Sequence, residues 1–208
     1  SFMDEVCTEL KKDPVQFRLE LFEKAKKEPP PANDQQARFR YDPDKYRSVV
    51  ELVAKMCNWG KTPPGVHRGM ATWYSFGSYA AQVVELKMVN GHPRIVKVFC
   101  AVNCGRVINL SGAENQIQGA IVDGIWHAMF SKVTFVNGAV AETNFHTYKF
   151  LRMKDAPLDI EVKFVASDEA PTGLGEPALP PVAAARANAI YAATDKRIRK
   201  MPFAEQLG

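Results

Sequence analysis

The stretch SYAAQVVELKMVNGHPRIVKVFCAV, residues 78–102, decides the fold. It contains two runs rich in apolar and β-branched residues, 78–89 and 94–102, joined by the tetrapeptide Asn-Gly-His-Pro. Asn-Gly is the strongest short signal for a β-hairpin, because both residues tolerate the left-handed backbone of a tight turn. We therefore expect two antiparallel strands over these residues.

Two further segments extend this β-structure. A second Asn-Gly pair separates SKVTFV (131–136) from AVAETNF (139–145), which predicts another hairpin. The run IEVKFVAS (160–167) predicts one more strand. Because strands and helices do not alternate regularly, we expect an α+β fold, with antiparallel or mixed hairpins packed against helices and preceded by a helical segment.

Two helices are expected at the start of the chain. Apolar residues spaced four apart predict the first over 2–12. Asp13 suits an N-cap and Pro14 the first helical position, and Gln16 completes a capping-box pattern for the second helix.

A third helix is expected after a linker. The proline-rich stretch 28–36 is typical of a surface linker. The Asp-Pro pair at 42–43 repeats the arrangement of cap and proline, and Gly60 is placed to end the helix that follows. We therefore predict a helical segment over 1–60 and a second domain over 66–208.

Two more helices are expected in that second domain. The stretch 111–130 opens with a possible capping box formed by Ser111 and Glu114. An apolar stripe at every fourth position follows, formed by Ile117, Ile121, Ile125 and Met129. The last helix is expected over 180–194, where alanine predominates and would allow a close approach to a sheet or a cofactor.

Composition argues against two classes of partner. With 27 basic and 23 acidic residues the formal charge is 27 − 23 = +4, too mild and too scattered for a nucleic-acid surface. No apolar stretch approaches the roughly 20 residues that a membrane helix needs. We expect neither nucleic-acid binding nor a membrane span.

The four cysteines, Cys7, Cys57, Cys100 and Cys104, are too few and too irregularly spaced for a disulfide framework. Cys100 and Cys104 could form half of a metal site, although no second cysteine or histidine pair completes it; buried thiols are the alternative. The four histidines form no metal-binding pattern, and the motifs of serine hydrolases and phosphate-binding loops are absent.

Glu176 is the first candidate functional residue. It lies between Gly175 and Pro177, directly before the last predicted helix. A carboxylate in such a loop could act as a general base, positioned by a flexible glycine and a stiff proline. It could also be an ordinary carboxylate at a helix N-terminus, where free N–H groups favour an anion.

Gln116 and Gln118 are the second candidates. Two amide side chains beside a helix N-terminus could bind a polar ligand such as a phosphate or the edge of a pterin. The alternative is a helix–sheet contact that needs small residues, to which Gly119 and Gly124 on the same helix would contribute.

Four separated motifs occur in a recognisable order. They are RGMATWYSFGSYAAQVVEL (68–86), VNCGRVINLSGAENQIQGAIVDGI (102–125), NFHTYKFLRM (144–153) and SDEAPTGLGEPALPPVAAARANAIYAATDKRIRKMPF (167–203). Together with SFMDEVCTELKKDPVQFRLELF (1–22) they resemble the C-terminal part of the molybdopterin-binding large subunit of the xanthine dehydrogenase/aldehyde oxidase family. The likeness is greatest to the isoquinoline 1-oxidoreductase beta-subunit branch.

The resemblance implies a function and a site. Glu176 matches the family's catalytic base towards a molybdenum-bound hydroxyl, and Gln116 and Gly175 match cofactor-binding positions. The implied enzyme oxidises an N-heterocycle or an aldehyde with oxygen from water. Its cofactor is molybdenum–molybdopterin, in the cytosine dinucleotide form, and a partner subunit carries iron–sulfur clusters.

The family's large subunit is much longer than 208 residues. We therefore expect a fragment or a split subunit, inactive alone, whose partners are the N-terminal portion of the large subunit, a small iron–sulfur subunit and a small-molecule substrate. Leu110 and Thr172 depart from the residues common in the family. The alternative is a cofactor-free structural or interaction domain. The compartment, bacterial cytoplasm or periplasm, stays open.

Overall fold

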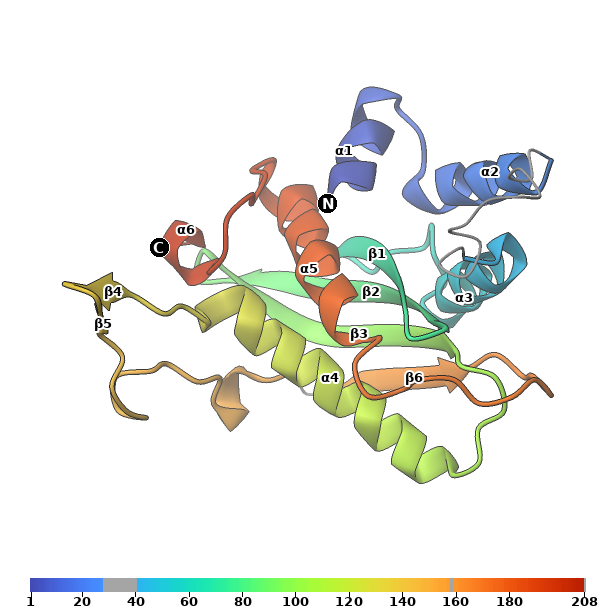
Figure 1. Ribbon diagram of the computed structural model, residues 1–208. Helices are drawn as coiled ribbons and strands as arrows, with labels where there is room; N and C mark the ends of the chain where they lie inside the picture. The colour runs from blue at the N-terminus through green and yellow to red at the C-terminus, as the bar shows by residue number, and fades with distance from the viewer. Residues whose placement is uncertain (28–40, 158, 208) are drawn as a thin grey trace.

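A four-stranded mixed sheet lies at the centre of the protein (Figure 1). The computed structural model describes residues 1–27, 41–157 and 159–207. The strands are β1 (His67–Ser75), β2 (Ser78–Val89), β3 (His92–Asn103) and β6 (Ile160–Phe164), in the order β1-β2-β3-β6. The first three are antiparallel, and β6 pairs parallel to β3. This arrangement confirms the predicted fold class.

The hairpin predicted over residues 78–102 is confirmed, since β2 and β3 pair antiparallel. Val89 pairs with His92 across the turn, where Asn90 and Gly91 both adopt positive φ, 51° and 79°. Strand β2 covers the predicted run 78–89. Strand β1 was not predicted, because its nine residues include Gly69 and form no continuous apolar run.

Helices cover both faces of the sheet. Their bounds are α1 (Phe2–Glu9), α2 (Pro14–Lys27), α3 (Pro43–Met56), α4 (Leu110–Phe130), α5 (Leu179–Thr194) and α6 (Ala204–Leu207), with a 3₁₀ turn at Met153–Asp155. Helices α4 and α5 pack with one face of the sheet, and α2 and α3 with the other. Among the helices so described, none is long and apolar enough to cross a membrane.

Two helix starts agree with the sequence. The Asp13 carboxylate accepts from the backbone N–H groups of Val15 and Gln16, both at 2.9 Å. Asp42 accepts from the backbone N–H groups of Asp44 and Lys45 in the same way.

Helix α3, however, ends at Met56, before the predicted Gly60. The predicted linker 28–36 lies outside the described residues.

The predicted capping box of α4 is wrong. The N-cap is Asn109, whose side-chain oxygen accepts from the Gly112 N–H at 3.0 Å. Ser111 donates its hydroxyl to that same oxygen at 3.1 Å and does not cap the helix. The predicted stripe is correct, since Ile117, Ile121 and Ile125 are fully buried. Helix α5 begins one residue before its predicted start and ends at the predicted residue.

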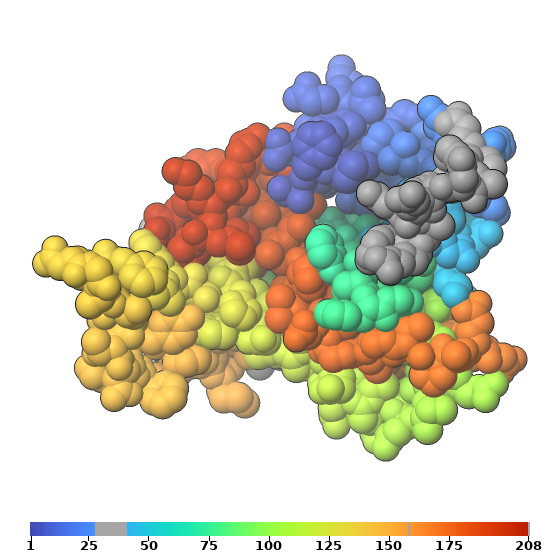
Figure 2. Space-filling view, viewed as in Figure 1, coloured from blue at the N-terminus to red at the C-terminus, as the bar shows by residue number. Residues whose placement is uncertain are grey.

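The second predicted hairpin is much shorter than expected. Its turn at Asn137 and Gly138 forms, but β4 (Phe135–Val136) and β5 (Ala139–Val140) have two residues each. Their side chains are exposed, Phe135 at 70%, so no core holds longer strands together. Figure 2 shows this segment, in yellow, protruding from the body of the protein.

The sheet separates two hydrophobic clusters. On one face, Val84 and Val98 pack with α4 and α5. On the other, Val83 and Phe99 pack with α3. Strand β2 is therefore buried on both faces, which explains its nearly continuous apolar sequence. Helices α2 and α3 of the first predicted segment thus share one of these clusters with the sheet. The predicted boundary between 1–60 and 66–208 stays a prediction.

Two glycines allow α5 to pack closely against its neighbours. A Cβ atom at Gly69 of β1 would lie 2.2 Å from the Ala185 carbonyl oxygen. A Cβ atom at Gly124 of α4 would lie 2.5 Å from the Leu179 carbonyl oxygen. These contacts exclude any larger residue at either position without movement of the α5 backbone.

The two glycines of α4 give a matched test. We expect Gly124→Ala to lower the free energy of unfolding by about 1–3 kcal/mol, because the added methyl group overpacks the α4–α5 contact. At Gly119 nothing lies within 4 Å of the added atom, so Gly119→Ala should raise the free energy of unfolding by up to about 1 kcal/mol through helix propensity. Urea denaturation measures both; equal effects of the two variants would contradict the packing argument.

Candidate cofactor-binding site

The loop that carries Glu176 is held firmly against the sheet. The Thr172 N–H donates to the Cys104 carbonyl at 2.9 Å, and the Gly173 N–H donates to the Phe76 carbonyl at 3.0 Å. The buried Ser78 hydroxyl donates to the Gly173 carbonyl at 2.5 Å. The loop is therefore fixed to the β1–β2 turn and to the residue that follows β3.

Gln82 fixes the junction between this loop and α5. Its side chain is fully buried in β2, and its amide nitrogen donates to the Ala178 carbonyl at 2.6 Å. Ala178 is the N-cap of α5. The Gln82 side-chain oxygen has no hydrogen-bond partner among the described residues. Gln82 was not predicted from the sequence. The one signal for it was an amide side chain within a mostly apolar strand.

Glu176 does not cap α5. The N-cap residue makes no side-chain hydrogen bond, and prolines occupy 180 and 181, so these positions have no N–H group to offer. The Leu179 N–H is already bonded to the Glu176 carbonyl at 3.0 Å. The interpretation of Glu176 as an ordinary helix-end carboxylate therefore loses its main support.

The carboxylate of Glu176 is uncommitted in this chain. The residue is exposed, and within the described part of the chain its side chain makes no hydrogen bond or ion pair. Gly175 beside it is also exposed, with no atom within 4 Å of where a Cβ would lie. At Gly173, by contrast, a Cβ atom would lie only 2.5 Å from the Cβ atom of Phe76. Neither glycine needs a left-handed backbone, so the predicted role of glycine flexibility in aiming Glu176 is not supported.

Gln116 and Gln118 have different surroundings. Gln116 is exposed in the second turn of α4. Gln118 is half-buried, and its amide donates to the Ile160 carbonyl of β6 at 3.4 Å. Residues two apart on a helix are separated by about 200° around its axis. The two amides therefore do not converge on one ligand: Gln118 is bonded to β6, whereas the Gln116 side chain makes no hydrogen bond in the described ranges.

The structure places Gln116 and Glu176 on neighbouring elements. Gln116 lies on α4, and Glu176 precedes α5; these helices pack together where Gly124 meets Leu179. The structure shows no direct contact between the two side chains. Both offer uncommitted polar atoms at the surface, and open space surrounds Gly175. Amide and carboxylate groups of this kind can bind a polar cofactor.

The thiols are separate from this site. Cys100 and Cys104 are buried, and burial raises the pKa of Cys100 to about 12 and that of Cys104 above its ordinary value. No group of three or more His, Cys, Asp or Glu residues in the described ranges is arranged to bind a metal ion. The cysteine pair thus agrees with the alternative of buried thiols.

The family model for the molybdopterin cofactor-binding domain matches residues 5–157. This chain belongs to that family, within the xanthine dehydrogenase/aldehyde oxidase group. The matched range includes Gln116 and ends before Gly175 and Glu176. Whole-chain relatives extend the likeness over those two residues.

Two relatives align with nearly the whole chain. The membrane-bound aldehyde dehydrogenase [pyrroloquinoline-quinone] of Gluconacetobacter polyoxogenes is 33% identical over 97% of this chain and 26% of its own length. Isoquinoline 1-oxidoreductase subunit beta of Brevundimonas diminuta is 28% identical over 98% of this chain and 24% of its own. The chain thus spans about a quarter of the length of these relatives.

Solved structures show the same fold. The aldehyde oxidoreductase of Desulfovibrio desulfuricans aligns with a TM-score of 0.54 at 23% identity, over 62% of this chain and 15% of that protein. Quinoline 2-oxidoreductase of Pseudomonas putida aligns with a TM-score of 0.52 at 24% identity, over 61% and 17%.

The buried thiols lead to a test of the metal-site alternative. We expect iodoacetamide at pH 8 to leave Cys100 unmodified in the native protein, because burial and a pKa raised to about 12 keep it protonated and inaccessible. In urea, all four cysteines should react. Mass spectrometry measures the labelling, and metal analysis of the same sample should give no stoichiometric zinc. Zinc at one equivalent, lost when Cys100 and Cys104 are both replaced by serine, would contradict this expectation.

Proposed function

We propose that this chain is the C-terminal cofactor-binding part of the large subunit of a molybdenum hydroxylase. The complete enzyme would oxidise an aldehyde or an N-heterocycle with oxygen derived from water. The family match and the names of the relatives support this reaction class. The observation that carries the residue assignment is a rigidly held loop that presents an uncommitted carboxylate, Glu176.

The proposed roles follow from what each side chain can do. When bound, the molybdenum–molybdopterin cofactor supplies the acceptor for two electrons. The Gln116 amide donates hydrogen bonds to the cofactor, and Gly175 leaves room beside it. Glu176 accepts the proton of the water-derived hydroxyl. Gln82 and Ser78 hold the loop in place, so that the carboxylate need not be reordered during turnover.

The base also needs surroundings that this chain alone does not provide. In this chain the Glu176 side chain is exposed to water. Contact with the cofactor and with the N-terminal portion of the large subunit would remove part of that water and leave the carboxylate facing the reacting group. We propose that the site is completed in this way, from two parts of the large subunit.

Electrons would leave through iron–sulfur clusters on a small partner subunit, and the pterin would be the cytosine dinucleotide form. The name of one relative includes pyrroloquinoline quinone. In an enzyme with that cofactor, the quinone and not molybdenum would carry out the redox chemistry. A cofactor-free structural domain is the other competing function. Analysis of the native complex for molybdenum, pterin and quinone distinguishes these possibilities.

The pair of glutamines tests the cofactor assignment. We expect about one molybdenum and one pterin per chain in the native complex, and a several-fold loss of both in Gln116→Ala. Gln118→Ala, on the opposite side of the same helix, should keep the wild-type content. Metal analysis and pterin fluorescence measure the result. A wild-type complex without molybdenum would refute the proposed function, and equal cofactor content in both variants would refute the role of Gln116.

Glu176 is tested by an isosteric change. We expect Glu176→Gln to lower kcat by at least about 10²-fold, the usual contribution of a general base, with cofactor content unchanged. Its carboxylate makes no hydrogen bond or ion pair within the described chain, so stability should not change. The control is Asp168→Asn, an exposed carboxylate on the same loop, which should retain activity. Steady-state kinetics with an aldehyde or N-heterocycle measure both; full activity of Glu176→Gln would refute its catalytic role.

A further inference from the structure

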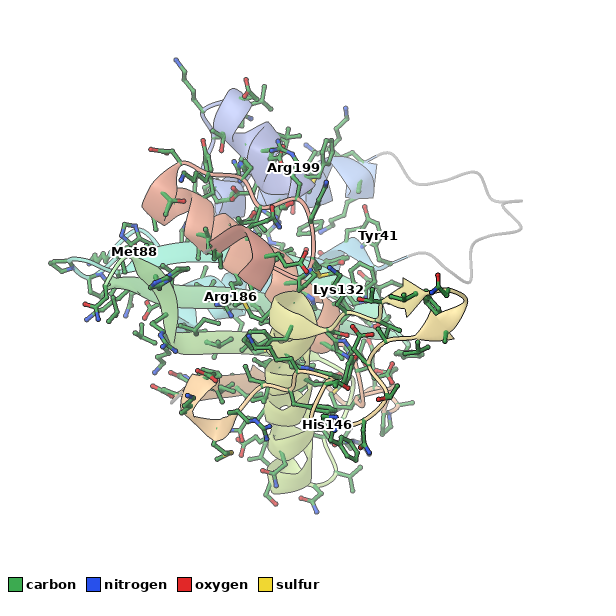
Figure 3. All side chains as sticks on the ribbon, turned by 90° about the vertical axis from the view of Figure 1, so that its left-hand side faces the viewer. Tyr41, Met88, Lys132, His146, Arg186 and Arg199 are labelled. Atoms are coloured by element: carbon green, nitrogen blue, oxygen red, sulfur yellow. The ribbon has the colours of Figure 1, made fainter. Side chains whose placement is uncertain are left out.

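A hollow lies away from the Glu176 loop. Its volume is about 820 Å³, and it is lined by the start of β3, the C-terminal end of α4, the segment 149–156, α5 and α6. Figure 3 labels Arg186 where α5, the sheet and the end of α4 come together. Nothing in the proposed function uses this hollow.

Arg186 is buried in the wall of this hollow. It is only 7% exposed, and its Nε atom has no hydrogen-bond partner among the described residues. In the same ranges the guanidinium group makes no ion pair. A buried cation without a partner is costly, and native proteins normally provide an anion or acceptor for such a group. An unpaired, buried guanidinium facing a hollow therefore points to an absent anion.

The other charges around the hollow are mostly positive. Arg94, Lys149 and Lys154 line it with Arg186, and the one acidic residue in the lining is Asp155. Asp155 is already paired with Arg94, at 3.3 Å between Oδ1 and Nη1. The Lys149 ammonium lies 4.3 Å from the centre of the Phe130 ring. The lining therefore carries an excess of positive charge that it does not neutralise itself.

Arg186 keeps its charge in this setting. Burial, and to a smaller extent the neighbouring positive charge of Arg94, lower the pKa of Arg186 to about 10. The group is thus still protonated at neutral pH. Apolar side chains, Met129, Leu151 and Leu207, form other parts of the wall. In such surroundings the attraction between a guanidinium and an anion is screened less than in water.

We propose that this hollow is a binding site for an oxyanion, a carboxylate or a phosphate group, held by Arg186. The planar guanidinium matches two oxygen atoms of such a group with parallel hydrogen bonds. Two sources offer the same chemistry. One is a free anion, and the other is an aspartate or glutamate side chain from the polypeptide beyond this chain, which spans about a quarter of its relatives' length. The proposal does not depend on the roles of Glu176 and Gln116.

Thermal unfolding of the native polypeptide, with its natural companions, tests the proposal. Wild type, Arg186→Met and the control Arg199→Met are compared in chloride and in inorganic phosphate at equal pH and ionic strength. Methionine keeps an apolar stem of similar length but removes the charge. Arg199 is exposed and pairs with Glu5. If the source is a free anion, phosphate should raise the Tm of wild type and Arg199→Met by several degrees and leave that of Arg186→Met unchanged.

If the source is a protein carboxylate, phosphate should not change the wild-type Tm. Arg186→Met should then unfold several degrees below wild type at pH 7.5, because a carboxylate is left buried without a partner. That deficit should shrink at pH 5, where the unpaired group takes up a proton.

Three results would overturn the proposal. The first is a phosphate effect that persists in Arg186→Met, since the anion would then bind elsewhere. The second is no phosphate effect together with an equal or higher Tm of Arg186→Met. The third is no phosphate effect together with a deficit of Arg186→Met that has the same size at both pH values, since Arg186 would then serve packing alone.

Discussion

The close contact between α5 and the edge of the sheet is the constraint on which the candidate site depends. Gly69 lets the α5 backbone approach β1 more closely than any side chain would allow. The buried Asn188 amide donates to the Met70 carbonyl at 2.9 Å and fixes the helix along the strand. Because α5 cannot shift along or away from β1, its first residue has a defined position, and so has the loop before it.

This constraint explains how a loop can be rigid and still present a free carboxylate. The hydrogen bonds that hold the loop involve backbone groups and the side chains of Ser78 and Gln82, and they leave the Glu176 side chain unused. Gln116 is presented in a similar way, on a helix whose buried stripe faces the core. Both candidate residues are thus positioned by packing within this chain, while their side chains are exposed at its surface.

Much of the fold could be predicted from the sequence, where one local signal dominated. The strands 78–89 and 94–102 followed from apolar runs and an Asn-Gly turn, and the starts of α2 and α3 from aspartates before proline. Strand β1 could not be predicted, because Gly69 is explained only by the helix that packs on it. The hairpin at 131–145 was predicted too long, since its sequence pattern does not reveal that no core lies beneath it.

The candidate site was less predictable from the residues alone. Physical patterns left Glu176 and Gln116 open, and the family resemblance supplied their proposed roles. Gln82 could not be identified from the sequence, because its hydrogen-bond partner, the Ala178 carbonyl, is 96 residues away. Arg186 is one basic residue in an alanine-rich helix, and only the three-dimensional arrangement shows that it is buried without a partner.

The two prolines at the start of α5 have a consequence for the molecules that can approach the loop. A helix start with free N–H groups attracts phosphates and carboxylates, but Pro180 and Pro181 contribute none. The Glu176 carboxylate therefore receives no hydrogen bond from these two positions. The Leu179 N–H is bonded to the Glu176 carbonyl, so the first turn of α5 offers an approaching anion no free N–H group. The backbone at this helix start is thus not an anion-binding site of the kind that many helices provide.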